Sequence, residues 1–139
     1  MRAALVVMIV AGATMAADQD RPRVVDAAAA KGRYLGVKVT GTDPYAFEDL
    51  VLVLDGSSRG TLSWVSRTNG DERSRIDMRL VEIQIEKGAF SARVEGRRPP
   101  KVPEVLKAQF VTRYPPENAK GSVRTGLLLA DGWFLESSR

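Results

Sequence analysis

Two residue types are missing from this chain, because its 139 residues include no cysteine and no histidine. Without them the protein cannot form a Ser-His-Asp triad, a thiol nucleophile, an imidazole acid or base, or a zinc site of thiolates and imidazoles. Disulfides cannot stabilise the fold either. These absences exclude several large classes of enzyme, and no remaining pattern predicts a cofactor.

A strong excess of one charge is also missing, since 21 Lys and Arg residues face 17 Asp and Glu residues. The chain is 44% hydrophobic and 27% charged, which is typical of one soluble domain with a single core. Gly-rich phosphate-binding motifs do not occur. We therefore expect one domain, with no nucleic acid among its partners.

The N-terminus has the three-part order of a secretory signal. Arg2 is followed by the uncharged residues 3–17, and the small residues Thr14 and Ala16 suit the subsites of a signal peptidase. This uncharged run is shorter than the roughly 20 residues that cross a bilayer. We expect residues 1–16 to be removed and the mature chain to be exported, to the periplasm or the extracellular space, without a membrane span.

Residues 17–31 form a polar and then Ala-rich leader. Asp26 is placed to cap a short helix over residues 27–31 that Gly32 would end. A disordered leader is the alternative, because the segment has little apolar surface to bury. We place the folded domain at residues 32–139.

From Gly32 onward, short apolar runs alternate with polar residues and are separated by Gly, Asn, Asp and Pro, with no helical periodicity. This rhythm predicts an all-β fold, an antiparallel β-sandwich (jelly-roll-like) of about eight strands, with a small up-and-down barrel as the alternative. The expected strands are 33–40, 47–54, 61–67, 76–85, 90–94, 106–110, 123–129 and a last one from 133.

Three local features refine this pattern. Asn69-Gly70 is a strong hairpin signal. The buried parity changes between Leu80 and Val81, so we expect a bulge or break there. Residues 47–54 are apolar on both faces, which predicts a strand covered on both sides.

Several motifs along the chain resemble one kind of protein. Gly32-Arg33-Tyr34-Leu35-Gly36 looks like a G-x-Y-x-G start, and residues 81–91 look like a strand followed by a Gly-x-Phe-Ser hairpin. The order of the last strands, through residues 106–110 and 119–124 to Gly132-Trp133, is similar as well. Together they resemble the small exported bacterial β-sandwich modules of uncharacterised function, over roughly residues 32–137. The resemblance implies a fold and an exported location, and it assigns no functional residue.

Paired carboxylates are the groups that remain for acid–base catalysis, as in glycoside hydrolysis. Glu82 and Glu86 share one face of an expected strand, and a solvated sheet face explains them equally well. Glu48-Asp49 stands either in a pocket or at an exposed strand entrance. We predict no catalytic residue from these pairs.

Oxygen ligands gather around the expected turn at residues 69–72, where Asn69, Asp71 and Glu72 have a spacing that a calcium loop can use. The full pattern of such a loop is missing, so a plain turn is the better interpretation. We predict no metal site.

A basic surface is the main candidate for binding. Arg97, Arg98 and Lys101 lie in the Pro-rich connection 96–103, shortly after Arg93. They can attract an anionic envelope polysaccharide or lipid surface, or they are simply solvated loop residues. Tyr45 and Tyr114 lie beside prolines and are candidates for surface contacts. By contrast, the strand parity of Trp64 and Trp133 places both in the core.

The leading hypothesis is therefore a secreted or periplasmic, non-enzymatic binding module whose partner is an envelope protein or polysaccharide. The first alternative is a lipocalin-like carrier, which needs an apolar cavity of some hundreds of Å³. The second is a carboxylate-based carbohydrate-active enzyme, which needs two carboxylates facing one cleft. The candidate ligand-binding residues are Arg93, Arg97, Arg98, Lys101, Tyr45 and Tyr114.

Overall fold

The computed structural model describes residues 18–117 and 120–138, so the expected signal peptide, residues 1–16, lies outside the described residues. The described residues form nine β-strands and no helix. The strands are β1 (Gln19–Pro22), β2 (Gly32–Thr42), β3 (Tyr45–Leu54), β4 (Gly60–Thr68), β5 (Asp71–Glu86), β6 (Ala89–Glu95), β7 (Val105–Tyr114), β8 (Arg124–Leu129) and β9 (Phe134–Ser137). Within this part of the chain, no helix is long and apolar enough to span a membrane.

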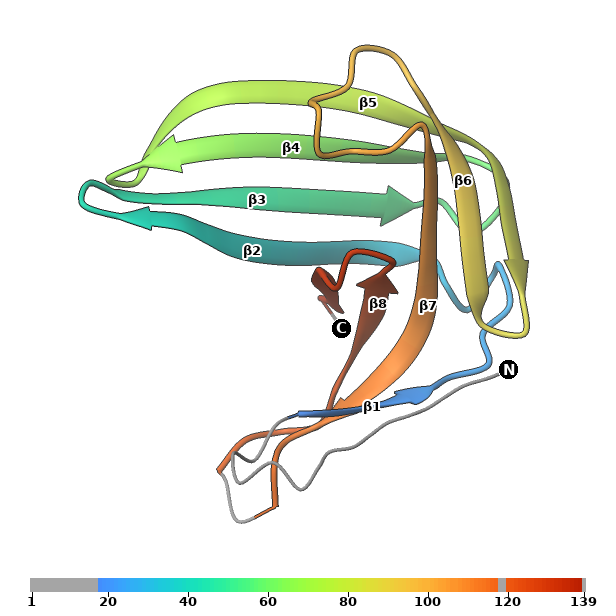
Figure 1. Cartoon of the computed structure of the whole chain (residues 1–139). Coiled ribbons are helices and arrows are strands. Elements are labelled where there is room, and N and C mark those ends of the chain that lie inside the picture. Colours follow the sequence, from blue (N-terminus) through green and yellow to red (C-terminus); the bar gives the residue numbers. More distant parts are fainter. Residues whose placement is uncertain (1–17, 118–119, 139) are drawn as a thin grey trace.

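From β2 to β9, each strand pairs antiparallel with the next, and β9 returns to pair with β2. The sheet therefore closes into an eight-stranded barrel (Figure 1). The all-β antiparallel prediction is confirmed, the sandwich was wrong, and the alternative barrel is the observed form. A sandwich and a barrel of hairpins bury alternate residues in the same way, so the strand pattern cannot distinguish them.

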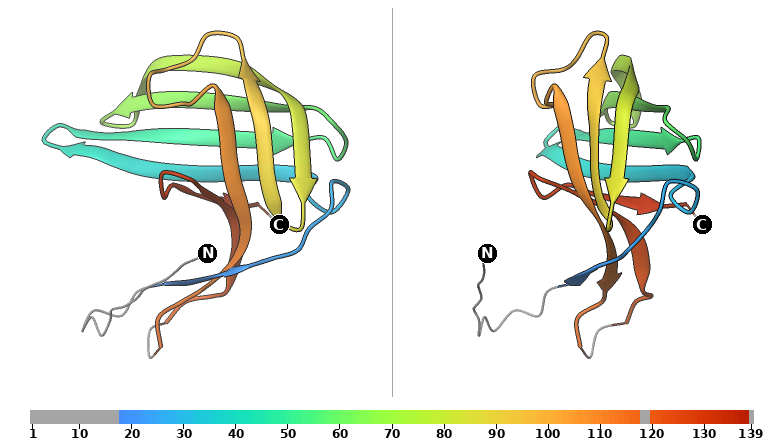
Figure 2. Two further views of the ribbon diagram at one scale, coloured as in Figure 1. Left: turned by 45° about the vertical axis from the view of Figure 1, so that its right-hand side comes forward. Right: turned by 90° about the vertical axis from the view of Figure 1, so that its right-hand side faces the viewer.

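The bend of β5 explains how one sheet makes two walls. Its register with β6 shifts between Val81 and Gln84, and Glu82 has a φ of 52°. The irregularity expected near Leu80 and Val81 is thus confirmed. β4 pairs with residues 71–80 of β5, and β6 pairs with residues 79–86. β2, β3, β4 and the first part of β5 run across the molecule, whereas β7 and its neighbours β6 and β8 are steeply inclined to them (Figures 1 and 2). Bulges form such corners between nearly orthogonal strands.

The barrel interior is filled by side chains from the inner face of every wall. Phe110 lies at its centre, with ring centroids 6.1 Å from Tyr34 and 6.3 Å from Phe90. The outer face of β3 is less covered, since Val53 is partly exposed. The expectation that residues 47–54 are covered on both sides was therefore wrong, because no second layer formed by the described residues packs on this part of the barrel wall.

The described part of the leader packs against the barrel. β1 pairs with β7, and Val25 and Ala30 belong to the buried core. At residues 27–30 the chain makes a turn and no helix, in which Asp26 Oδ1 accepts a hydrogen bond from the Ala29 N–H at 2.8 Å. The Tyr34 hydroxyl donates to the Ala30 carbonyl at 2.6 Å. These contacts tie the segment to the first strand of the barrel.

Candidate functional site

The barrel closes through a short seam between β2 and β9. Among the described residues, two residue pairs join these strands, Tyr34 with Ser137 and Leu35 with Glu136, and the Ser138 N–H donates to the Arg33 carbonyl at 2.9 Å. Most neighbouring strands of the barrel share five or more pairs. The wall is therefore least continuous at this seam.

Gly36 lies where the two strands part. A Cβ atom at this position would overlap Leu135 and lie 2.6 Å from Trp133 Nε1 and 2.8 Å from the Phe134 carbonyl oxygen. Glycine is thus required here for a close approach, which lets the Trp133 indole sit against the β2 backbone. Beyond Gly36, β2 continues without a strand on this side among the described residues.

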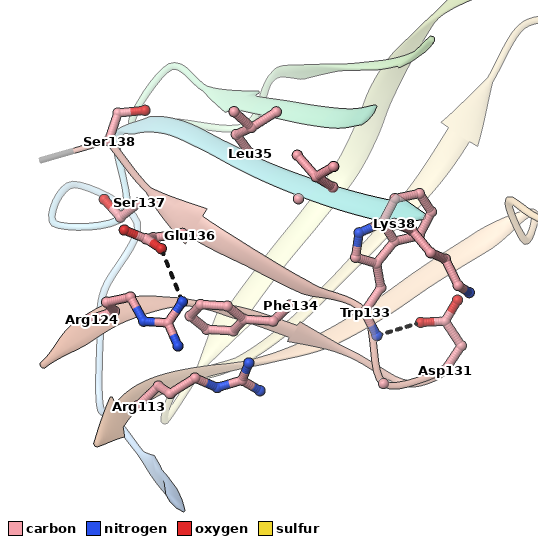
Figure 3. Close-up of a pocket in the computed structure, with 13 residues that line it drawn as sticks. Leu35, Lys38, Arg113, Arg124, Asp131, Trp133, Phe134, Glu136, Ser137 and Ser138 are labelled. Carbon is pink, nitrogen blue, oxygen red and sulfur yellow. Dashed lines mark hydrogen bonds and ion pairs between the residues drawn. The ribbon is translucent and has the colours of Figure 1, made fainter. Parts of the chain in front are cut away.

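A groove of about 710 Å³ follows the seam (Figure 3). One wall is β2 at residues 35–38, and the other is residues 131–134 together with the end of β9. Arg113 and Arg124 extend into it from β7 and β8. The groove therefore runs beside an open strand edge.

The orientation of the β2 backbone follows from the seam. The Arg33 carbonyl faces β9, because it accepts the hydrogen bond from Ser138. In an antiparallel strand, the N–H and C=O of one residue point to the same side, and alternate residues point to opposite sides. Val37 and Val39 therefore direct their N–H and C=O groups at the open edge, whereas Lys38 directs its own at β3.

A second open edge lies on β5, whose residues 71–78 pair with β4 alone in the described part of the chain. Its sequence, DERSRIDM, carries five charged residues in eight, as is usual for strand edges that must not associate. The open edge of β2, residues 37–42, reads VKVTGT and has one charge. The β2 edge thus lacks the charged residues that protect the β5 edge against association with another strand.

Apolar side chains lie next to the β2 edge on the outer face. Val37 and Val39 are 55% and 53% exposed, and Val39 pairs with Phe47 on β3. Tyr45, 47% exposed, contacts Phe47 with the ring centroids 5.6 Å apart. The exposed tyrosine and the two valines therefore form an apolar border along the edge.

Aromatic and basic side chains form the other end of the groove. The Arg113 and Arg124 guanidinium carbons lie 4.0 Å and 5.6 Å from the Phe134 ring centroid (Figure 3). Arg113 binds Asp20 through two hydrogen bonds of 2.7 and 2.8 Å, and these raise the pKa of Arg113 although partial burial opposes them. Arg124 contacts Glu136 at 3.4 Å. The positive charges of Arg113 and Arg124 are thus already paired with acidic side chains.

On the inner side of the groove, Lys38 lies over the Trp133 ring, with Nζ 5.3 Å from the ring centroid. Trp133 is 8% exposed, so its prediction as a core residue is confirmed, and Trp64 is partly buried against the same core. The Nε1 atoms of Trp64 and Trp133 are buried and have no hydrogen-bond partner among the described residues. For Lys38, the described part of the chain shows no ion pair.

The predicted basic residues do not join this groove. Arg93 pairs with Glu82 and Glu95 on the outer surface, and its hydrogen bond to Glu82 raises the pKa of Arg93. In the connection after β6, Arg97 is exposed and Arg98 Nη1 donates to the Val102 carbonyl at 2.8 Å. Arg93 and Arg98 thus make contacts within the fold.

Lys101 and Tyr114 have separate roles in the fold. Lys101 Nζ lies 3.1 Å from Glu48 Oε2, and Glu48 is only 7% exposed on the inner face of β3. Tyr114, at the end of β7, lies under the Arg21 guanidinium at 5.2 Å. None of the six residues predicted for ligand binding lines the groove, and Tyr45 lies on β3, where it pairs with Thr42 at the far end of β2.

The carboxylate pairs do not face a common cleft. Glu48 points to the inner face and Asp49 to the outer face, where it binds Arg67 at 2.9 Å. Glu82 lies in the β5 irregularity and is paired with Arg93. A pair of carboxylates that shares one substrate is therefore not formed by these residues.

The expected turn at Asn69-Gly70 is present, with φ values of 51° and 85° that are typical of a two-residue hairpin turn. Thr68 and Asp71, on either side of the turn, pair with each other, so the segment is the turn of the β4–β5 hairpin. Among the residues that the structure describes, no group of three or more acidic side chains is placed to hold a metal ion.

A second hollow, which the sequence does not indicate, lies where the connection after β6 crosses the barrel. Its volume is about 300 Å³. It is lined mainly by apolar side chains, which come from three strands and from the connection. Three charged residues, Lys101, Lys107 and Asp131, also line it. The ion pair of Lys101 with the buried Glu48 fastens the connection across this mouth of the barrel.

No protein-family model, curated protein or solved structure matches this chain. What the protein does must therefore be inferred from the groove, the open edge and the pocket themselves.

Proposed function

We propose that the mature chain is a non-enzymatic binding module of the bacterial envelope that takes an extended peptide along the open edge of β2. The observation that carries this proposal is the pair of outward-facing backbone units at Val37 and Val39, beside a groove of about 710 Å³. A strand added to such an edge gains main-chain hydrogen bonds, and neighbouring pockets select its side chains. The export signal expected at residues 1–16 supports an envelope location.

The edge also favours a ligand of particular chemistry. The register between β2 and β3 shifts between Val39 and Gly41, so the regular part of the open edge is residues 37–39, about 10 Å long and enough for about three residues of an extended peptide. Outward-facing ligand side chains would lie beside Val37 and Val39, which favours β-branched or aromatic residues. Inward-facing ones would lie beside Lys38, which favours an acidic residue. The ligand is thus an extended peptide that alternates apolar and acidic residues.

The test is the affinity of a fluorescein-labelled peptide, Thr-Val-Glu-Val-Glu-Val-Thr, measured by fluorescence anisotropy for the wild-type protein and Val39→Pro. Proline removes the edge-facing N–H of Val39 and leaves the β2–β3 hydrogen bonds intact, because these come from the alternate residues. We expect about a tenfold loss of affinity, the effect of one main-chain hydrogen bond and of its disturbed neighbour.

Val39→Thr is the matched control, because threonine keeps both the N–H and the branched side-chain shape, and it should retain most of the affinity. A second probe, the same peptide with N-methyl groups on every other residue, tests the edge without changing the protein. Two such peptides are possible, one methylated at the odd-numbered residues and one at the even-numbered residues. The peptide whose methyl groups replace the N–H groups that face β2 should not bind, and the other should bind almost as well as the unmodified peptide. Equal binding by Val39→Pro, or equal binding of both methylated peptides, would show that the edge is not the site.

A second function, the carriage of a small apolar molecule, is favoured by one observation, the pocket of about 300 Å³ at the mouth of the barrel. The interior itself is occupied by leucine and phenylalanine side chains. A carried molecule would therefore sit at the mouth, where the volume matches the lower limit of small-molecule sites.

A further inference from the structure

We infer that the pocket at the barrel mouth binds a monoanionic amphiphile, a medium-length aliphatic chain with a carboxylate head group that pairs with Lys107. This inference rests on the second function proposed above and names the chemical class of its ligand. It does not involve the open edge of β2.

The tail would be held by side chains that the fold has already taken out of water. Leu50, Val102, Leu106 and Leu129 line the pocket and are each buried, and the Trp133 ring forms another wall. They come from β3, the connection, β7, β8 and the turn before β9. An aliphatic chain fits such a surface, because it displaces water from apolar walls without leaving a polar group unpaired.

The head group is inferred from the state of the three charged residues around the pocket. Lys101 is held by Glu48 at 3.1 Å. Asp131 Oδ1 accepts a hydrogen bond from the Trp133 N–H at 2.9 Å and so serves the β8–β9 turn. Lys107 is exposed, and no ion pair involves it within the described ranges. Within the described ranges, Lys107 is therefore the cation at the pocket that has no anionic partner.

The connection that covers the pocket is fastened by polar contacts. Arg98 Nη1 donates to the Val102 carbonyl at 2.8 Å, and the Lys101–Glu48 pair lies next to it in sequence. The Val94 N–H donates to the Glu104 carbonyl at 2.8 Å and closes the base of the connection. These bonds hold the connection in place over the apolar walls, so the pocket exists before the ligand arrives.

The experiment is isothermal titration calorimetry of the mature protein with decanoate and, separately, with decanol. Decanoate should bind more tightly than decanol to the wild type, and Lys107→Gln should weaken decanoate about tenfold while leaving decanol unchanged. Lys87→Gln, a lysine in the β5–β6 turn away from the pocket, is the matched control and should change neither affinity. Shortening the acid by one methylene should cost about threefold to fourfold in affinity.

Two further outcomes separate the inference from the function on which it rests. If decanol and decanoate bind equally, and Lys107→Gln changes neither, the pocket carries apolar molecules but the head-group assignment is wrong. If neither ligand binds, both the second function and the inference are overturned. Val105→Phe, which fills the pocket from an exposed position, should abolish both ligands, and retained binding would place them elsewhere.

Discussion

Phe110→Ala is expected to lower the free energy of unfolding by about 3–5 kcal/mol, the usual cost of removing a fully buried phenylalanine ring. Phe110 is 0% exposed, and its ring makes edge contacts with both Tyr34 and Phe90. The barrel wall on all sides is hydrogen-bonded, so it cannot collapse into the space that the ring leaves. The loss should therefore approach the upper part of this range.

The measurement is urea unfolding followed by circular dichroism, with Tyr45→Ala as the control. Tyr45 is an aromatic residue of similar size at an exposed hairpin tip, and its truncation should cost less than about 1 kcal/mol. If Phe110→Ala costs no more than Tyr45→Ala, the ring cluster is not the centre of the core.

A chain that ends at Leu135 is expected to lose its cooperative unfolding transition. The two residue pairs of the seam and the bond between Ser138 and Arg33 all depend on residues 136–138. Without them β2 has no partner on that side, and buried side chains such as Leu127 and Leu135 lie beside an open gap. The barrel then becomes an open sheet with two unpaired edges, which favours association of chains.

Thermal unfolding and light scattering measure this effect. The double variant Glu136→Ala and Ser137→Ala is the control, because it keeps the backbone of β9 and should unfold near the wild-type temperature. A truncated chain that melts as sharply and at the same temperature as the full chain would show that the seam is not needed for closure.

Much of the fold follows from local pattern. The hairpin at Asn69-Gly70 and the irregularity near Val81 depend on residues close in sequence, and both are present. The choice between sandwich and barrel depends instead on whether the last strand returns to the first. That choice is made by two residue pairs about a hundred residues apart, Tyr34 with Ser137 and Leu35 with Glu136, and alternation along a strand carries no information on it.

The candidate sites were harder to predict for the same reason. Tyr45 was expected at the surface and lies there, because a proline-marked turn keeps it out of any strand interior. The groove, however, combines β2 with Arg113, Arg124 and Phe134, which meet only when the barrel closes. Arg93 pairs with Glu82 and Lys101 with the distant Glu48, and the sequence could not predict these partners, since charge in a sequence does not reveal its partner.

The most direct test of the proposed strand addition is amide hydrogen exchange, measured by NMR with and without the Thr-Val-Glu-Val-Glu-Val-Thr peptide at saturation. The amides of Val37 and Val39 face the open edge and should exchange far more slowly once the peptide is bound, whereas the Lys38 amide, already bonded to β3, should change little. A bound peptide that leaves the Val37 and Val39 amides exchanging at their free rates would contradict the account.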